Sequence, residues 1–240
     1  MFNQAECTAR GISEVDESKK SSAHFTDFEK SILSKSVLDI GAGKDPVVAH
    51  AEVFDLAQGD ANHITSFVKK QFDCVYSSHC LEHMHNPSEA IREWWRLIKP
   101  EGFLFFTVPD EDLYEQGVFP SRFNGDHKHT FTLAKKKSWS PVSINVIDFV
   151  AKLPDVEVVS VSLNDIGYDR RFVKHGLFKT GAIFRFFTRL IGSLKKRGLN
   201  FFSEKAEAFF NRHSLVDQTR SNALAQIEVI LRKKPLPLGV

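Results

Sequence analysis

The sequence has 240 residues, of which 42% are hydrophobic and 26% charged, as in an ordinary globular protein with one core. A net charge of +2 does not require an acidic partner, and the three cysteines form no Cys-x-x-Cys pair that would indicate disulfides or structural zinc. Neither an uncharged 18-residue apolar stretch nor an early apolar run with a cleavage site is present, so we expect a soluble, cytoplasmic protein.

The first part of the chain predicts alternating strands and helices. Residues 1–30 are polar and charged, and Ser18–Ser22 within them predict a solvated segment. A helix is expected from Asn86 and Pro87 onward, because asparagine caps helices and proline favours their first position. Short apolar runs typical of buried parallel strands lie at 36–40, 52–56, 72–77 and 102–108.

The second part of the chain is less regular. The segment 110–140 is too long to be a simple connection between two elements, which predicts a functional loop. Beyond it we expect a helix over 143–153, a strand over 156–163, and a last, antiparallel strand over 225–231, at or near the edge. The alternation predicts an α/β, Rossmann-like doubly wound, mostly parallel sheet with right-handed crossovers. The expected units are an N-terminal segment (1–30), a core (31–163 and 223–234) and a helical insert or lid (164–222).

The first strand leads into a glycine loop suited to ligand binding. Gly41 and Gly43 can adopt positive φ and have no Cβ, so a ligand can approach their backbone at the carboxyl ends of the strands. A nicotinamide dinucleotide site is the alternative. It is disfavoured because Pro46 occupies the third glycine position of that motif, and because only nine residues separate Gly43 from Val53.

Carboxylates follow the strands near this loop. Asp55 ends the second strand, where it can accept hydrogen bonds from both hydroxyls of a ribose. Asp60 and Ala61 can meet an adenine amino group, and Asp39 can serve a ligand ammonium group through water. Three carboxylates on successive strand-end loops therefore predict an adenosine-containing cofactor.

These motifs resemble the class I S-adenosylmethionine-dependent methyltransferases. VLDIGAG (37–43) is similar to their first motif, and residues 72–109 resemble their strand–helix–strand unit, including Lys99-Pro100-x-Gly102. The resemblance covers roughly residues 31–163 and implies S-adenosylmethionine as the cofactor. The expected cofactor site consists of Asp39, Gly41, Ala42, Gly43, Asp55, Leu56, Asp60, Ala61, Ser78 and His79.

The sequence also departs from that family's pattern. The first crossover helix is nearly absent, the strand expected between Asp60 and Phe72 is missing or vestigial, and Lys44-Asp45-Pro46 replaces the usual run into a helix. These departures leave open a non-catalytic partner module that keeps the fold.

Methyl transfer to a hydroxyl needs an aligned acceptor and a base. His79, at the end of the third strand, is either such a group or a residue that packs against the adenosine. Glu82 and His83 are expected to start or cap a turn. His83 and His85 lack a third convergent ligand, so we predict no metal site.

A second polar cluster lies in the long loop. His127 is the preferred base, because the pKa of histidine lies near neutrality. Tyr114, Asp126 and His129 are expected to orient it or to contact the acceptor, and Asp110 to bind the acceptor. The alternative is a surface loop whose polar groups bond only their own backbone.

The acceptor is suggested by resemblance alone. Residues 109–132 resemble a signature of bacterial methyltransferases from surface-polysaccharide gene clusters. That resemblance implies O-methylation of a sugar or phosphorylated glycan unit. N-methylation of a small molecule is the nearest alternative.

The predicted insert is basic and rich in phenylalanine. Between Arg170 and Lys205 there are ten lysines and arginines but only one acid, Glu204. We prefer a helical lid that packs its phenylalanines on the domain, and the alternative is peripheral contact with an anionic membrane or phosphate-rich partner. A nucleic-acid partner is not expected, because no recognised binding motif is present. Trp94 and Trp95 are expected in the core, and the oligomeric state is left open.

Overall fold

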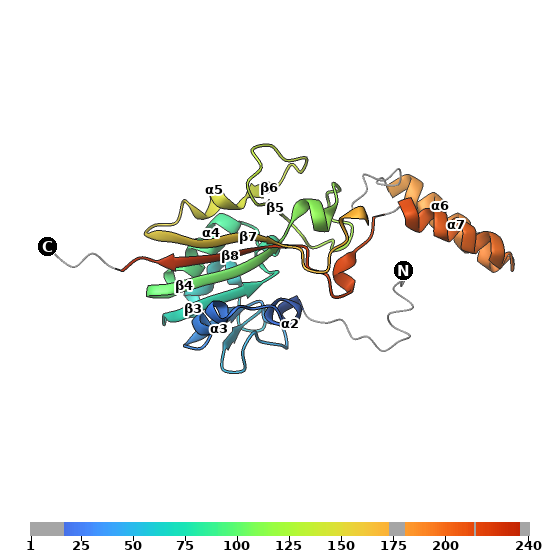
Figure 1. The fold of residues 1–240 in the computed structure, drawn as a ribbon. Helices are drawn as coiled ribbons and strands as arrows, with labels where there is room; N and C mark the ends of the chain where they lie inside the picture. The colour runs from blue at the N-terminus through green and yellow to red at the C-terminus, as the bar shows by residue number, and fades with distance from the viewer. Residues whose placement is uncertain (1–16, 173–180, 214, 236–240) are drawn as a thin grey trace.

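The structure is a computed structural model that describes residues 17–172, 181–213 and 215–235 (Figure 1). The expectations for residues 1–16, and for Lys174 and Lys179 of the basic insert, lie outside the described residues. The helices are α2 (Glu17–Ser22), α3 (Asp27–Ile32), α4 (Pro87–Arg96), α5 (Val146–Val150), α6 (Gly181–Lys196) and α7 (Asn200–His213). Short helical segments are η1 (Ala61–Ser66), η2 (Leu81–His83), η3 (Glu111–Glu115), η4 (Arg170–Phe172) and η5 (Gln218–Arg220).

A six-stranded sheet in the order β2-β1-β3-β4-β8-β7 forms the centre of the fold. Strands β1 to β4 are parallel, and β8 runs antiparallel between β4 and β7. The mostly parallel sheet with an antiparallel last strand is therefore confirmed, and β8 lies one strand in from the edge. The strands are β1 (Val37–Ile40), β2 (Glu52–Phe54), β3 (Phe72–Ser78), β4 (Ile98–Pro109), β7 (Val156–Asn164) and β8 (Gln226–Lys233).

Helices cover both faces of this sheet (Figure 1). On one face, α4 and α5 enclose the larger apolar core, and on the other α3 packs Ile32 against the sheet. Helix α4 begins as predicted, because the Asn86 side chain accepts a hydrogen bond from the backbone N–H of Glu89. Trp94 and Trp95 are buried, and each indole N–H donates to a backbone carbonyl, so their expected place in the core is confirmed.

Two local predictions are wrong. Ser18–Ser22 is not a solvated segment: Lys20 and Ser21 are buried, and Ser21 hydrogen-bonds with Gln226 of β8. Residues 143–153 do not form one helix, because β6 (Ser143–Asn145) pairs in parallel with β5 (Thr130–Thr132) and α5 starts only after it. In both cases a tertiary contact overrides the local pattern.

The departures noted in the sequence are borne out by the described residues. Residues 41–51 contain turns but no helix between β1 and β2. Between β2 and β3 the chain forms η1, in the place where the family pattern has a further strand. The loops at the carboxyl ends of β1 and β2 lie next to each other, joined by the hydrogen bond from the Gly43 N–H to Asp55.

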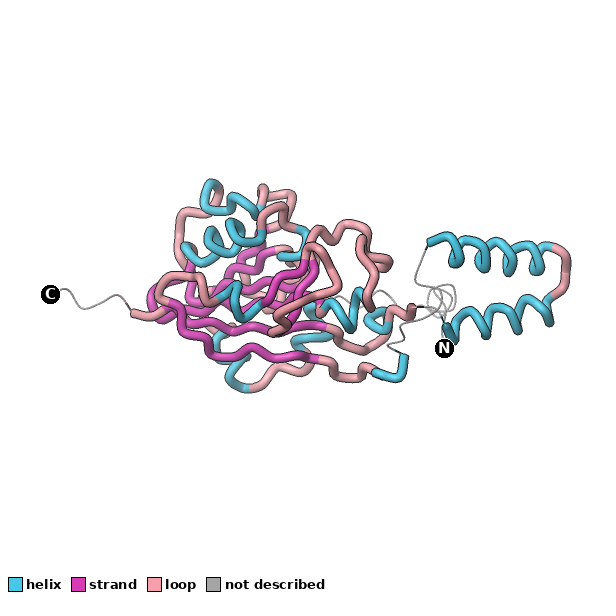
Figure 2. Tube along the Cα trace, turned by 90° about the horizontal axis from the view of Figure 1, so that it is seen from above, coloured by secondary structure: helices cyan, strands magenta, loops and turns pink. Residues whose placement is uncertain are grey.

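The insert forms a helical hairpin of α6 and α7 that projects away from the sheet (Figures 1 and 2). Its main contacts are between the two helices, where Ile191 packs with Phe187 and Ala206. The expected packing of its phenylalanines on the domain is wrong for Phe186, Phe201 and Phe202, which are each about 60% exposed. The hairpin is helical, as predicted, but it does not cover the strand ends. None of the described helices is long and apolar enough to span a membrane.

Candidate active site

The glycine loop adopts the left-handed backbone that its sequence predicted. Gly41 has φ of 80° and Gly43 has φ of 61°. A Cβ at position 41 would lie 2.8 Å from the Cβ of Cys80, whereas a Cβ at position 43 would meet nothing within 4 Å. Gly41 is therefore required for packing, and Gly43 borders open space into which a ligand can approach the backbone.

The second strand closes this cradle. The backbone N–H of Gly43 donates to Asp55 Oδ2 at 2.7 Å, which fixes the loop against the end of β2. Leu56, the next residue, is 91% exposed, so its apolar side chain is free to cover a purine ring. An open glycine, an adjacent carboxylate and an exposed leucine fit the adenosine and ribose of S-adenosylmethionine.

The remaining residues of the predicted cofactor site lie around the cradle. Asp39 is fully buried and accepts a hydrogen bond from the Val47 N–H at 2.7 Å. Asp60 caps η1, and its hydrogen bonds with Asn62 hold the pKa of its carboxyl below the ordinary value. Ser78 is buried and accepts a hydrogen bond from the Thr107 hydroxyl. Their direct contacts with cofactor remain predictions, as do those of Ala42 and Ala61.

Three histidines surround one buried carboxylate just beyond β3. Glu82 Oε1 lies 3.4 Å from His79 Nδ1, 3.9 Å from His127 Nε2 and 4.0 Å from His83 Nε2. With Glu115, which contacts His127, we call these residues the Glu82 cluster. Cys80, the residue that packs against Gly41, lies between His79 and Glu82 in the chain, so the cluster adjoins the cofactor cradle.

Two of the histidines are oriented by further carboxylates. His127 Nδ1 lies 2.7 Å from Glu115 Oε1, and His83 Nδ1 lies 3.0 Å from Asp126 Oδ2. Because each Nδ1 is engaged in this way, each Nε2 is the ring nitrogen turned toward Glu82. Asp126 therefore orients His83 rather than its neighbour His127.

The third histidine is held from the opposite side. His79 has φ of 51° and its Nε2 lies 2.9 Å from the Gln226 side-chain oxygen. Gln226 is in turn hydrogen-bonded to Ser21. The N-terminal helix α2 thus helps to position a residue of the site, a connection that the sequence did not predict.

Glu82 and His83 lie in the turn η2 before α4, close to their expected place, but the Glu82 side chain does not cap that turn. It is fully buried, and neither oxygen has a hydrogen-bond partner of normal geometry among the described residues. Burial alone would raise the pKa of this carboxyl, but His79, then His127 and His83, outweigh that effect and hold it below its ordinary value. Such a group needs a positive charge beside it.

The other residues predicted in the long loop lie at different distances from the Glu82 cluster. His127 is buried, and the ring of Tyr114 lies over it with centroids 5.2 Å apart. His129 Nε2 lies 3.4 Å from the backbone oxygen of His85, at the margin of the cluster. Asp110 caps η3, and burial raises the pKa of its carboxyl to about 6. Acceptor contacts by Asp110 and His129 remain predictions.

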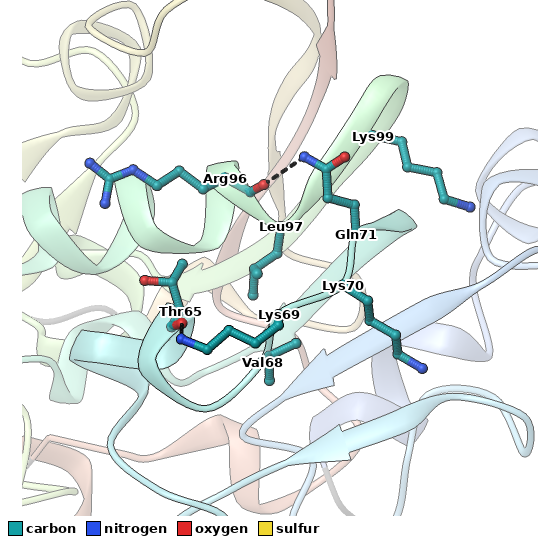
Figure 3. Close-up of a pocket in the computed structure, with 8 residues that line it drawn as sticks. All are labelled: Thr65, Val68, Lys69, Lys70, Gln71, Arg96, Leu97 and Lys99. Atoms are coloured by element: carbon teal, nitrogen blue, oxygen red, sulfur yellow. Dashed lines mark hydrogen bonds between the residues drawn. The ribbon is translucent and has the colours of Figure 1, made fainter.

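An open cavity of about 600 Å³ lies elsewhere, at the amino ends of β3 and β4 (Figure 3). It is basic, but Lys70 pairs with Glu52, and Lys99 with Asp73. Its place at the opposite end of the parallel strands separates it from the glycine loop. The lining residues are Thr65, Val68, Lys69, Lys70, Gln71, Arg96, Leu97 and Lys99.

Comparison with known proteins identifies the central part of the chain. Residues 33–106 match the family model described as "Methyltransferase domain". This segment runs from before β1 into β4, and it holds the glycine loop, Asp55 and Glu82. The match indicates an S-adenosylmethionine-dependent methyltransferase domain in this part of the chain. The protein is thus a methyltransferase whose cofactor is S-adenosylmethionine.

Solved structures of similar fold include a SAM-dependent methyltransferase from Archaeoglobus fulgidus (13% identity, TM-score 0.48, covering 90% of this chain and 95% of that one). A plantazolicin methyltransferase in complex with SAH is similar at 15% identity and TM-score 0.44, over 95% of this chain and 90% of that one. A putative sarcosine dimethylglycine methyltransferase from Galdieria sulphuraria is similar at 14% identity and TM-score 0.40, over 84% and 78%. No curated protein matches the chain.

Proposed function

We propose that this methyltransferase acts on a hydroxyl oxygen of a small molecule, such as a sugar or phosphorylated glycan unit. The observation that carries the proposal is the Glu82 cluster, which gathers imidazole and carboxylate groups beside the cofactor cradle. The glycan class is supported only by the resemblance of residues 109–132 to polysaccharide methyltransferases.

The chemistry explains why such a cluster favours oxygen over nitrogen. In the transfer, the bond from the methyl carbon to sulfur breaks while a bond to the acceptor oxygen forms, and the hydroxyl proton must leave. A neutral amine attacks with its own lone pair, so it depends less on a neighbouring base. His127 is the best placed residue to activate the hydroxyl, because Glu115 engages its Nδ1, which leaves Nε2, on the side of Glu82, as the ring nitrogen available for the reaction.

The product distinguishes these acceptors directly. The protein is incubated with S-adenosylmethionine carrying a ¹³C-labelled methyl group, together with sugars, sugar nucleotides, phosphorylated glycans and, separately, small amines. We expect a labelled O-methyl carbon, which NMR separates from an N-methyl carbon by its chemical shift. Labelled N-methyl products alone would replace this proposal by N-methylation. Cofactor binding without transfer to any acceptor would favour a non-catalytic module.

We also propose that the α6–α7 hairpin contacts an anionic membrane surface. Its exposed apolar side chains are accompanied by exposed cations, and Lys205 lies over the Phe201 ring at 4.4 Å. Apolar groups that enter a lipid interface beside cations that meet its headgroups are typical of peripheral membrane helices. The apolar group is Phe186, Leu190, Leu199, Phe201, Phe202 and Phe209, and the cations are Arg189, Lys195, Lys196, Arg197 and Lys205.

Vesicle sedimentation tests this contact. We expect binding to vesicles that contain phosphatidylglycerol but not to pure phosphatidylcholine, and weaker binding as salt is raised. The double variant Phe201→Ser/Phe202→Ser should bind at least about 10-fold less, since two large apolar side chains are lost. Ile147→Ser on α5, an exposed apolar residue outside the hairpin, is the control. Equal binding to anionic and neutral vesicles would contradict the proposal, as would an equal loss of vesicle binding in the control variant.

A further inference from the structure

We propose that Glu82, His83 and His127 together bind one divalent transition-metal cation, for which Zn²⁺ is the probe. The use of this cation to activate the acceptor hydroxyl rests on the proposed function, whereas the binding itself does not. The site deepens the role of the Glu82 cluster by placing a fixed positive charge beside a buried carboxylate that otherwise has only histidine rings near it.

The three donor atoms already converge. One ligand atom from each residue lies within 4.8 Å of the others, and both Nε2 atoms are 3.9–4.0 Å from Glu82 Oε1. In a tetrahedral zinc site with bonds of about 2.0–2.1 Å, ligand atoms lie about 3.3–3.4 Å apart. Small side-chain rotations close that difference. Two histidines and one glutamate also leave a fourth position open for an acceptor oxygen.

The surroundings of the two histidines are those of metal ligands. In metal sites, the ring nitrogen that does not bind the ion donates to a carboxylate or carbonyl, which fixes the ring and raises its basicity. Here Glu115 engages Nδ1 of His127 and Asp126 engages Nδ1 of His83. Both rings therefore present Nε2 to the same point, from two segments of the chain that are distant in sequence.

The buried carboxylate is the independent observation. Glu82 is fully buried, and its two oxygens lack hydrogen-bond partners of normal geometry among the described residues. A buried charge without a partner strongly disfavours folding unless a cation compensates it. Either a metal ion or a protonated histidine provides that charge, and the paired orientation of the two Nε2 atoms favours the metal.

The donor set also specifies the class of metal. Imidazole nitrogens suit Zn²⁺, Fe²⁺ and similar ions, whereas Mg²⁺ and Ca²⁺ prefer oxygen ligands. The pair considered in the sequence, His83 with His85, is not the one that converges. His127 and Glu82 supply the missing partners, and His85 is exposed outside the set.

The test is calorimetric titration of ZnCl₂ into the full-length protein after removal of metals by a chelator, without cofactor or acceptor. We expect one Zn²⁺ per chain with a micromolar or tighter Kd, and no comparable binding of Mg²⁺. His83→Asn and His127→Asn should each weaken binding by at least about 10-fold, because each removes one of three ligands. His85→Asn, a neighbouring histidine outside the set, should bind as the wild type does.

A more conservative variant tests the site even if replacing a histidine prevents folding. Glu115→Gln keeps the shape of the side chain but removes the carboxylate behind His127, and we expect Zn²⁺ affinity about 10–100-fold lower. Circular dichroism establishes that each variant is folded. Absence of Zn²⁺ binding by the folded wild type, or unchanged affinity in His83→Asn and His127→Asn, would overturn the site. Full methyl transfer by chelated, metal-free protein would overturn the metal's role but leave the proposed function intact.

Discussion

Replacing His127 by asparagine is expected to lower kcat for methyl transfer by about 10²–10⁴-fold, the range for removal of a positioned acid–base group. The affinity for S-adenosylmethionine should stay within about twofold, because His127 belongs to the long loop rather than to the glycine loop. The loss is expected whether Nε2 meets the acceptor hydroxyl itself or holds the cation that does. Steady-state kinetics with both substrates varied measures it.

The matched variant is His85→Asn, which removes a nearby but exposed imidazole and should retain wild-type kcat. Thermal unfolding of both variants separates loss of chemistry from loss of fold. Nearly unchanged kcat in folded His127→Asn would contradict the assignment of the Glu82 cluster as the place where the acceptor is activated.

Gly41→Ala is expected to reduce the free energy of unfolding by about 2–4 kcal/mol, because the new side chain is strained in a left-handed backbone and overpacks its surroundings. The residue has φ of 80°, and an added Cβ would lie 2.8 Å from Cys80. Gly43→Ala is the informative partner, because its Cβ would meet nothing within 4 Å. It should cost only about 1–2 kcal/mol of stability while clearly weakening cofactor binding.

Urea unfolding at equilibrium measures both stabilities, and titration with the cofactor measures both affinities. The two substitutions should have different effects. Gly41→Ala should cause the larger loss of stability, whereas Gly43→Ala should weaken cofactor binding with a smaller loss of stability. Equal effects of the two substitutions on stability would show that the packing of Cys80 against the loop is wrong.

The core of the fold was predictable because its signals are local. Val37–Ile40 is an apolar run that ends in glycines, and Asn86-Pro87 marks a helix start by its own capping chemistry. The predictions failed where partners from elsewhere decide the structure. Ser143–Asn145 forms a strand because it pairs with β5. Ser21 is buried where its hydroxyl hydrogen-bonds with the Gln226 side chain.

The site was predictable to a similar extent. The glycine loop and Asp55 are adjacent in the sequence motif and in space, so the cofactor cradle could be predicted. The Glu82 cluster could not, because His127 joins Glu82 and Glu115 only after the long loop folds back over the end of β3. Nothing in the sequence distinguishes Glu115 from the other acids of the same loop. Three-dimensional proximity alone identifies it.

The central claim, an S-adenosylmethionine site at the carboxyl ends of β1 and β2, is tested most directly by calorimetric titration of that cofactor. NAD serves as the control ligand, and Asp55→Ala as the control variant. We predict a micromolar Kd, equivalent to about −8 kcal/mol, with no binding of NAD and weaker binding in the variant, which lacks the carboxylate that we expect to bind the ribose. Failure of the folded wild-type protein to bind S-adenosylmethionine would contradict the account.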